Sequence, residues 1–153
     1  MAPDPMQTRR DAALADLIEG VPYARFLGIR FDRRGDELTA ILPFRDMLIG
    51  VPTPPALHGG ATAAFLETAA LIELAWRSTW DRMETGTPLP PLPRPINMTV
   101  DYLRPGLPRD AFARARVNRF GRRYASVHVE AWQDNRERLF AQATGHFLMP
   151  QGT

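Results

Sequence analysis

A glycine pair that leads into a helix-compatible segment with an internal acidic residue is the most chemically suggestive feature of this sequence. Gly59 and Gly60 open the segment, and Glu67 lies about two turns further on. The first turn of a helix carries unsatisfied N–H groups and a positive dipole end, and glycine lets a ligand carbonyl approach the backbone closely. The pattern therefore predicts a carbonyl-polarising or oxyanion site.

Glu67 is surrounded in the sequence by alanine, leucine and phenylalanine. Burial of a carboxylate is costly, and it raises the pKa towards the range that is useful for acid–base chemistry. Each of these residues also has a structural interpretation. Gly59-Gly60 is compatible with a simple turn, Glu67 with a salt-bridged residue at a subunit contact, and His58 with a hydrogen-bonded loop residue.

The remaining titratable residues do not form a second recognisable motif. Glu73 is interpreted as structural, and so are His128 and His146, which lie in strand-like segments without ligand-like spacing. The pattern predicts no metal cluster. Because the chain has no cysteine, disulfides, thiolate nucleophiles and cysteine zinc sites are excluded.

The elements that must position these residues follow from periodicity and from turn residues. One helix is predicted over residues 8–20, with Thr8 as its N-terminal cap. A second helix is predicted over residues 61–79. Two proline-rich connections occupy residues 44–57 and 81–95. Strands are predicted over residues 23–31, 37–43, 97–103, 112–120, 124–132 and 138–149.

The segment 61–79 is apolar on nearly every face, which is typical of a helix inside a protein. Antiparallel strands around one such helix indicate an α+β domain. We therefore predict a helical segment over residues 1–22 and a main domain over residues 23–150. The edges of the sheet need covering, which favours association with further copies of the chain.

Composition restricts the classes of partner. The 153 residues fit one domain, and the net charge of +2 does not indicate nucleic-acid binding, although all 19 basic residues are arginine. Residues 1–10 lack the apolar region of a signal peptide, and no apolar run reaches the length of a membrane helix. A cytoplasmic location is the resulting expectation.

Four segments together resemble a known family. They are His58-Gly59-Gly60 with Glu67 nine positions after the histidine, Asn97–Pro105, Phe120–Tyr124 and Ala141–Phe147. Between residues 23 and 149 their order resembles that of hotdog-fold thioesterases. The phenylacetyl-CoA and 4-hydroxybenzoyl-CoA thioesterase group is the most similar.

The resemblance implies a hotdog fold, which is a curved antiparallel sheet wrapped around a central helix. It implies a homodimer, often paired into a homotetramer, with active sites between subunits. The Gly59 and Gly60 amides of one subunit, following His58, would polarise the thioester carbonyl. Glu67 of the other subunit would act as nucleophile or as general base. The implied reaction hydrolyses an acyl-CoA to CoA and a carboxylic acid and needs no cofactor.

The resemblance also suggests where the rest of the substrate binds. Arg104, Arg122 and Arg123 are candidates for the CoA phosphates, which arginine binds with two donors, and Asn97 is a candidate for the pantetheine arm. The alternative is that the arginines are solvated turn residues. Phe65, Trp76 and Trp80 are compatible with an acyl pocket or with ordinary core.

Two positions depart from the family pattern. Pro52 stands where one branch has asparagine or glutamine, and Leu71 stands where another branch has threonine. Hydroxyl groups that could assist instead belong to Thr62, Thr68, Ser78 and Thr85. These departures keep open a non-catalytic acyl-CoA binder. A hotdog hydratase or dehydratase is a separate alternative, which would need His58 and Glu67 to converge on one substrate carbon.

Overall fold

The computed structural model describes residues 1–86 and 88–151, without the side chains of Trp80 and Asp81. The N-terminal half contains helices α1 (Pro5–Glu19) and α2 (Pro22–Leu27), strands β1 (Arg30–Arg34) and β2 (Glu37–Leu42), the short helix η1 (Asp46–Leu48), and strands β3 (Ile49–Pro52) and β4 (Pro55–Leu57). The long helix α3 (Gly59–Thr85) and strands β5 (Arg94–Tyr102), β6 (Ala111–Phe120), β7 (Tyr124–Trp132) and β8 (Ala141–Leu148) complete the chain.

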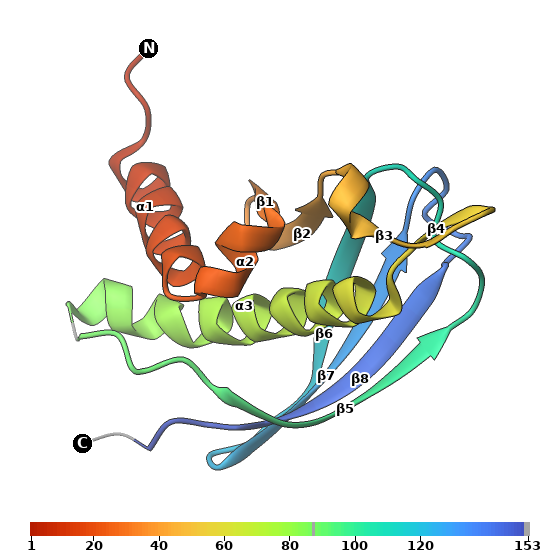
Figure 1. The fold of residues 1–153 in the computed structure, drawn as a ribbon. Coiled ribbons are helices and arrows are strands. Elements are labelled where there is room, and N and C mark those ends of the chain that lie inside the picture. The colour runs from red at the N-terminus through yellow and green to blue at the C-terminus, as the bar shows by residue number, and fades with distance from the viewer. Residues whose placement is uncertain (87, 152–153) are drawn as a thin grey trace.

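A six-stranded antiparallel sheet with the order β1-β2-β6-β7-β8-β5 curves around α3 (Figure 1). Helices α1 and α2 contact α3 from the other side, so α3 is enclosed between the sheet and two smaller helices. The predicted α+β class and hotdog architecture are thereby confirmed.

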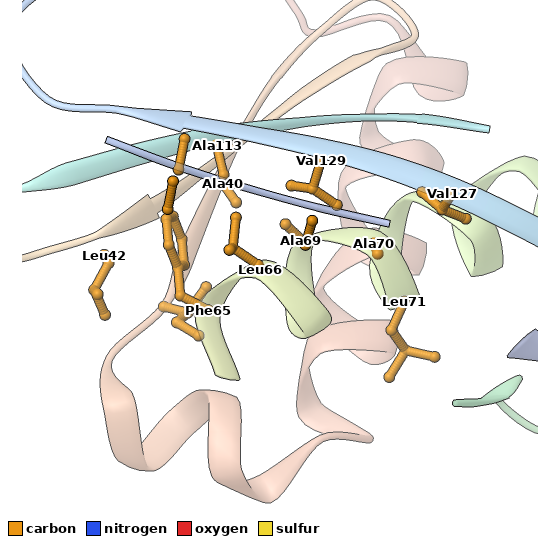
Figure 2. Packing of buried hydrophobic residues seen from close by; sticks show 14 of the residues in the cluster. Ala40, Leu42, Phe65, Leu66, Ala69, Ala70, Leu71, Ala113, Val127 and Val129 are labelled. Carbon is orange, nitrogen blue, oxygen red and sulfur yellow. The ribbon is translucent and has the colours of Figure 1, made fainter. Parts of the chain in front are cut away.

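Close packing between α3 and the sheet depends on small residues on the inner face of the strands. Figure 2 shows Ala40 and Ala113 facing Phe65 and Leu66 of α3. Phe65 and Leu66 are completely buried. The alanines let the helix lie close to the sheet, and the larger helix side chains fill the space between them.

The predicted strand over residues 23–31 is wrong in its first part, because residues 22–27 form α2. Pro22 occupies the first turn of this helix, and Gly28 ends it with a left-handed φ of 77°. Ala24 and Leu27, three positions apart, are buried, as they are on one face of a helix. The strand begins only at Arg30, and the predicted boundary between residues 22 and 23 falls inside α2.

The N-terminal helix starts earlier than predicted. Asp4, and not Thr8, caps α1, and its carboxylate accepts a hydrogen bond from the N–H of Met6 at 3.0 Å. Leu14 and Leu17 of this helix pack with Trp76 of α3 in a second hydrophobic cluster. The segment 1–22 therefore covers part of the central helix.

Two further elements differ from the predictions. The connection 44–57 contains η1 and the hairpin formed by β3 and β4, and α3 extends beyond residue 79 to Thr85, where Gly86 ends it with a φ of 70°. No residue between 79 and 86 is proline or glycine, so nothing stops the helix sooner. None of the helices in the described part of the chain has the length and apolar character needed to cross a membrane.

The start of α3 is held by the preceding segment. The N–H of His58 donates to the carbonyl of Leu48 at 2.7 Å. Gly50 lies against the same residue, since a Cβ on Gly50 would stand 2.7 Å from the Cα of His58. A side chain at position 50 would therefore displace the residue that precedes the helix.

Gly50→Ala tests this contact. We expect a loss of about 1–3 kcal/mol in the free energy of unfolding, because the added methyl group collides with backbone rather than with a movable side chain. Urea denaturation measures it. Val51→Ala, at an exposed neighbouring position, is the control and should change stability by less than about 0.5 kcal/mol. Equal stability of the Gly50 variant and wild type would contradict the contact.

Candidate active site

The N-terminus of α3 offers fewer hydrogen-bond donors than the sequence predicts. The N–H of Gly60 donates to Nδ1 of His58 at 2.9 Å, so the imidazole caps the helix. A Cβ on Gly60 would stand 2.9 Å from this ring, which explains why glycine is needed there. Among the described residues, the N–H of Gly59 has no acceptor. Of the two glycine amides, only that of Gly59 is available to a ligand in this arrangement.

Tyr102, at the end of β5, is a site residue that the sequence analysis missed. Its hydroxyl donates to the carbonyl oxygen of Gly59 at 2.8 Å, and its ring lies against the Cα of the same glycine. The alternation of residues 97–103 places Tyr102 on a strand, but it gives no sign of the partner, which is 43 positions earlier in the chain. This bond ties the edge strand to the start of α3.

Glu67 is a half-buried carboxylate on the same face of α3 as Gly60. Residues seven positions apart in a helix differ by only about 20° in direction, and they are separated by about 10 Å along the axis. Among the described residues, Glu67 has no hydrogen-bond or ion-pair partner. The salt-bridged interpretation thus finds no partner within the described part of one protomer.

Three of the four hydroxyl groups considered as substitutes for the missing polar residues donate to carbonyl oxygens of α3. Thr68 donates to the carbonyl of Ala64 at 2.8 Å, and Ser78 donates to that of Leu74 at 3.1 Å. Thr85 donates to the carbonyl of Arg82 at 3.3 Å, and Thr62 is buried. None of these contacts directs a hydroxyl group towards Glu67.

Asn97 lies on the outer face of the sheet, where its Oδ1 is 2.7 Å from Nδ1 of His146 on β8. The inward positions of β5 are those of Met98 and Val100, which pack on the core. His128 makes a similar cross-strand contact, since its Nδ1 is 3.2 Å from the hydroxyl of Thr144. Within one protomer, Asn97 therefore does not face α3.

The structure separates the three predicted phosphate-binding arginines. Arg104 donates its N–H to the carbonyl of Phe140, just before β8, whereas the carbonyl of Arg123 accepts from Met149, just after β8. The eight residues of β8 span about 26 Å. Arg104 thus lies near the start of α3, and Arg122 and Arg123 lie at the far end of the sheet. One protomer does not bring them together.

Arg122 instead meets two arginines of α3 that the sequence analysis did not single out. Arg77, Arg82 and Arg122 line a cavity of about 280 Å³, whose lining contains no carboxylate among the described residues. Phe120, which also lines it, is 52% exposed. Arg77 and Arg82 are about 40 positions from the β6–β7 turn, so only the tertiary fold could show this cluster.

Glu73 is the residue whose ionisation the structure perturbs most clearly. Desolvation by burial raises the pKa of this carboxyl to about 7, against the opposing effect of Arg77 and Arg114. The described residues contain no group of three or more histidine, aspartate or glutamate side chains suited to a metal ion.

Two of the three aromatic residues considered for an acyl pocket belong to the core. Phe65 and Trp76 are almost completely buried. The side chain of Trp80 lies outside the described residues.

Comparison with known proteins identifies the family. Residues 50–148 match the model of the family described as the acyl-CoA thioesterase N-terminal domain. The medium/long-chain acyl-CoA thioesterase YigI of Escherichia coli is 33% identical over 145 residues, which cover 84% of this chain and 86% of YigI.

Solved structures of similar proteins support the same family and fold. A protein of Chromobacterium violaceum is 34% identical, with a TM-score of 0.67 and coverage of 92% of each chain. The PaaI protein of E. coli, from the phenylacetic acid degradation operon, has a TM-score of 0.75 at 17% identity and covers 95% of this chain and 96% of its own, which supports the fold. The chain therefore belongs to the acyl-CoA thioesterase family of hotdog-fold thioester hydrolases, as its sequence motifs predict.

Proposed function

We propose that this protein hydrolyses acyl-CoA with Glu67 as the catalytic carboxylate and the Gly59 amide as the group that polarises the thioester carbonyl. The observation that carries the proposal is a half-buried carboxylate without a partner among the described residues, about two turns along the same helix from an unoccupied N-terminal amide. The dipole of α3 adds to the polarisation of the carbonyl.

Two protomers are needed for this chemistry. The amide of Gly59 lies about 12 Å along the axis from Glu67 of the same helix, whereas a catalytic contact requires about 3 Å. Gly59 of one protomer must therefore act with Glu67 of another. Gly60, Ala63 and Glu67 are all partly exposed, so this face of α3 is open to a second copy.

Strand β5 is the edge through which we propose that the dimer forms. It has a sheet neighbour on one side only, and Ile96, Tyr102 and the following Leu103 are exposed at 55%, 56% and 48%. Pairing of two β5 strands would satisfy the free backbone groups and extend the sheet through both protomers. We further propose that two such dimers form a tetramer, and light scattering after gel filtration measures the mass.

In the reaction, a water oxygen bonds to the thioester carbon, the carbon–sulfur bond breaks, and the CoA thiolate leaves and takes up a proton. Glu67 acts as general base for this water or attacks the carbon itself and forms an acyl anhydride that water then hydrolyses. Single turnover in ¹⁸O-water tests for the anhydride, because label in Glu67 requires an acyl-glutamyl intermediate. Direct attack by water labels only the released acid, whereas hydrolysis of the anhydride at the glutamyl carbon labels Glu67. Water is the only co-substrate, and no cofactor is required.

We infer that the substrate carries a medium or long acyl chain, because YigI bears that description and matches most of this chain. A cytoplasmic location agrees with an acyl-CoA substrate. A hydratase mechanism is disfavoured, since Nδ1 of His58 accepts the hydrogen bond of the Gly60 amide and so caps α3.

The guanidinium cavity formed by Arg77, Arg82 and Arg122 is our candidate for the nucleotide end of CoA. Ser78, which also lines it, is eleven positions after Glu67 and therefore on the same helix face, about 16 Å away. An extended pantetheine arm can bridge that separation. Three guanidinium groups suit the phosphates, and the exposed ring of Phe120 suits stacking with adenine.

Glu67→Gln should reduce kcat/KM at least a hundredfold for acyl-CoAs from two to sixteen carbons, because the amide can neither attack nor accept a proton. Release of CoA is measured with a thiol reagent. Glu84→Gln, an exposed position on the same helix, is the control and should retain activity. Tight acyl-CoA binding without turnover by the wild type would favour the non-catalytic binder, and full activity of the Glu67 variant would overturn the mechanism.

Arg122→Gln combined with Arg82→Gln tests the nucleotide site. We expect KM for octanoyl-CoA to rise tenfold or more, since charge-assisted contacts to phosphate are lost. The kinetics with octanoyl-N-acetylcysteamine, which lacks the nucleotide, should not change. Arg9→Gln, an exposed arginine of α1, is the control. Equal losses with both substrates would show a structural defect instead of a phosphate contact.

A further inference from the structure

Strands β2 and β6 are neighbours in the sheet but pair over only part of their length. Three residue pairs join them, Ala40 with Ala113, Ile41 with Phe112, and Leu42 with Ala111. Beyond this point β6 continues along β7 to Phe120, while β2 is paired only with β1. A cavity of about 340 Å³ lies where the two strands diverge, and its lining includes residues of both strands and of α3.

The central helix contributes Glu73 to this cavity. The residue is half-buried, and the described residues provide no hydrogen bond or ion pair to its carboxylate. Arg77 and Arg114 lower its pKa, but burial has the larger effect and raises the pKa to about 7. An ionised Glu73 therefore lacks a close counterion.

The other carboxylates of the cavity already have basic partners. Glu130 lies 3.3 Å from Arg136 and 3.8 Å from His128. Glu37 lies 3.9 Å from Arg114, whose guanidinium also donates to the hydroxyl of Thr39 at 3.0 Å.

The two remaining charged residues of the lining also have polar partners. Asp36 lies 3.7 Å from Arg10, and Arg116 donates to the side-chain oxygen of Asn118 at 3.2 Å. Among the described carboxylates that line the cavity, Glu73 alone has no close basic partner, so a positive charge that enters would find its counterion there.

We propose that this cavity is a second ligand site, in which Glu73 binds the ammonium or guanidinium group of a small organic cation. Leu38 and Ala115, which also line the cavity, provide apolar surface for a short aliphatic stem. The volume of about 340 Å³ is within the range of small-molecule sites. A carboxylate and a guanidinium group can form two parallel hydrogen bonds.

The second site is separate from the proposed active site. Residues six positions apart in a helix point in directions about 120° apart, so Glu67 and Glu73 lie on different faces of α3. Ligand binding by Glu73 therefore requires neither Glu67 nor hydrolytic activity. This independence allows the two proposals to be tested separately.

Calorimetric titration of the full chain at pH 8 with agmatine, putrescine and arginine tests the site, with butanol as the uncharged probe. We expect saturable binding of at least one cation, no binding of butanol, and affinity at least tenfold lower in Glu73→Gln, which keeps the shape of the side chain but not its charge. Comparison of agmatine with arginine shows whether an added carboxylate is accepted near the arginines. Glu67→Gln and Glu84→Gln should bind like wild type.

Several results would overturn the site. Absence of saturable binding by all three cations would do so, as would equal affinity of wild type and Glu73→Gln. Loss of binding in Glu67→Gln but not in Glu73→Gln would place the cation in the active site instead. Folding of each variant is checked by circular dichroism and urea denaturation.

The pH dependence of thermal stability and of cation binding gives a second test of the site. The pKa of Glu73 in the folded protein, about 7, exceeds the ordinary value of 4.5, so the folded state binds the proton more tightly than the unfolded state. The free energy of unfolding therefore falls as pH rises from about 4.5 to 7. Glu73→Gln should therefore have a higher Tm than wild type at pH 8 and a similar Tm at pH 5. Cation binding should weaken more than tenfold between pH 8 and pH 5.5. A pH-independent difference in Tm would contradict this assignment.

Discussion

Enclosure of the central helix α3, whose middle part is mostly apolar, is the constraint on which the rest of this structure depends. The sheet must curve to cover α3, its inner face must carry small residues such as Ala40 and Ala113, and α1 and α2 must cover what the sheet cannot. Under this constraint a carboxylate on α3 is exceptional, because desolvation opposes its charge. The helix has two such carboxylates in its central part, Glu67 and Glu73, and both lie where the enclosure is incomplete.

The N-terminus of α3 shows how the same backbone groups can serve stability and chemistry. His58 caps the helix by accepting a hydrogen bond from the Gly60 amide. The neighbouring Gly59 amide has no acceptor among the described residues and is available to a ligand. Tyr102 fixes the carbonyl of that same residue from the edge strand. Since Glu67 lies two turns away, the proposed joint action of Gly59 and Glu67 would need a second protomer. Oligomerisation would then be a condition of catalysis as well as of sheet closure.

The arginine residues acquire different roles from their positions in the sheet. Arg114 and Arg136 contact carboxylates on the outer face, where they neutralise neighbouring charge. Arg77, Arg82 and Arg122 line a cavity without a described carboxylate, although Arg77 also lowers the pKa of Glu73. The β6–β7 turn and the C-terminal half of α3 line this cavity together.

The sequence by itself was sufficient for the α+β class and for the buried central helix, because apolar periodicity and helix-start signals are local. Its assignment of Gly59 and Glu67 as the chemical motif stays a prediction. It misassigned residues 22–27, where Pro22 and Gly28 outweighed a strand-like pattern. Only the tertiary structure showed that His58 occupies the Gly60 amide, that Tyr102 holds Gly59, and that Arg104 and Arg122 lie at opposite ends of β8. It alone revealed the divergence of β2 and β6 around Glu73. These features depend on contacts between residues far apart in the chain, whose distances no local pattern determines.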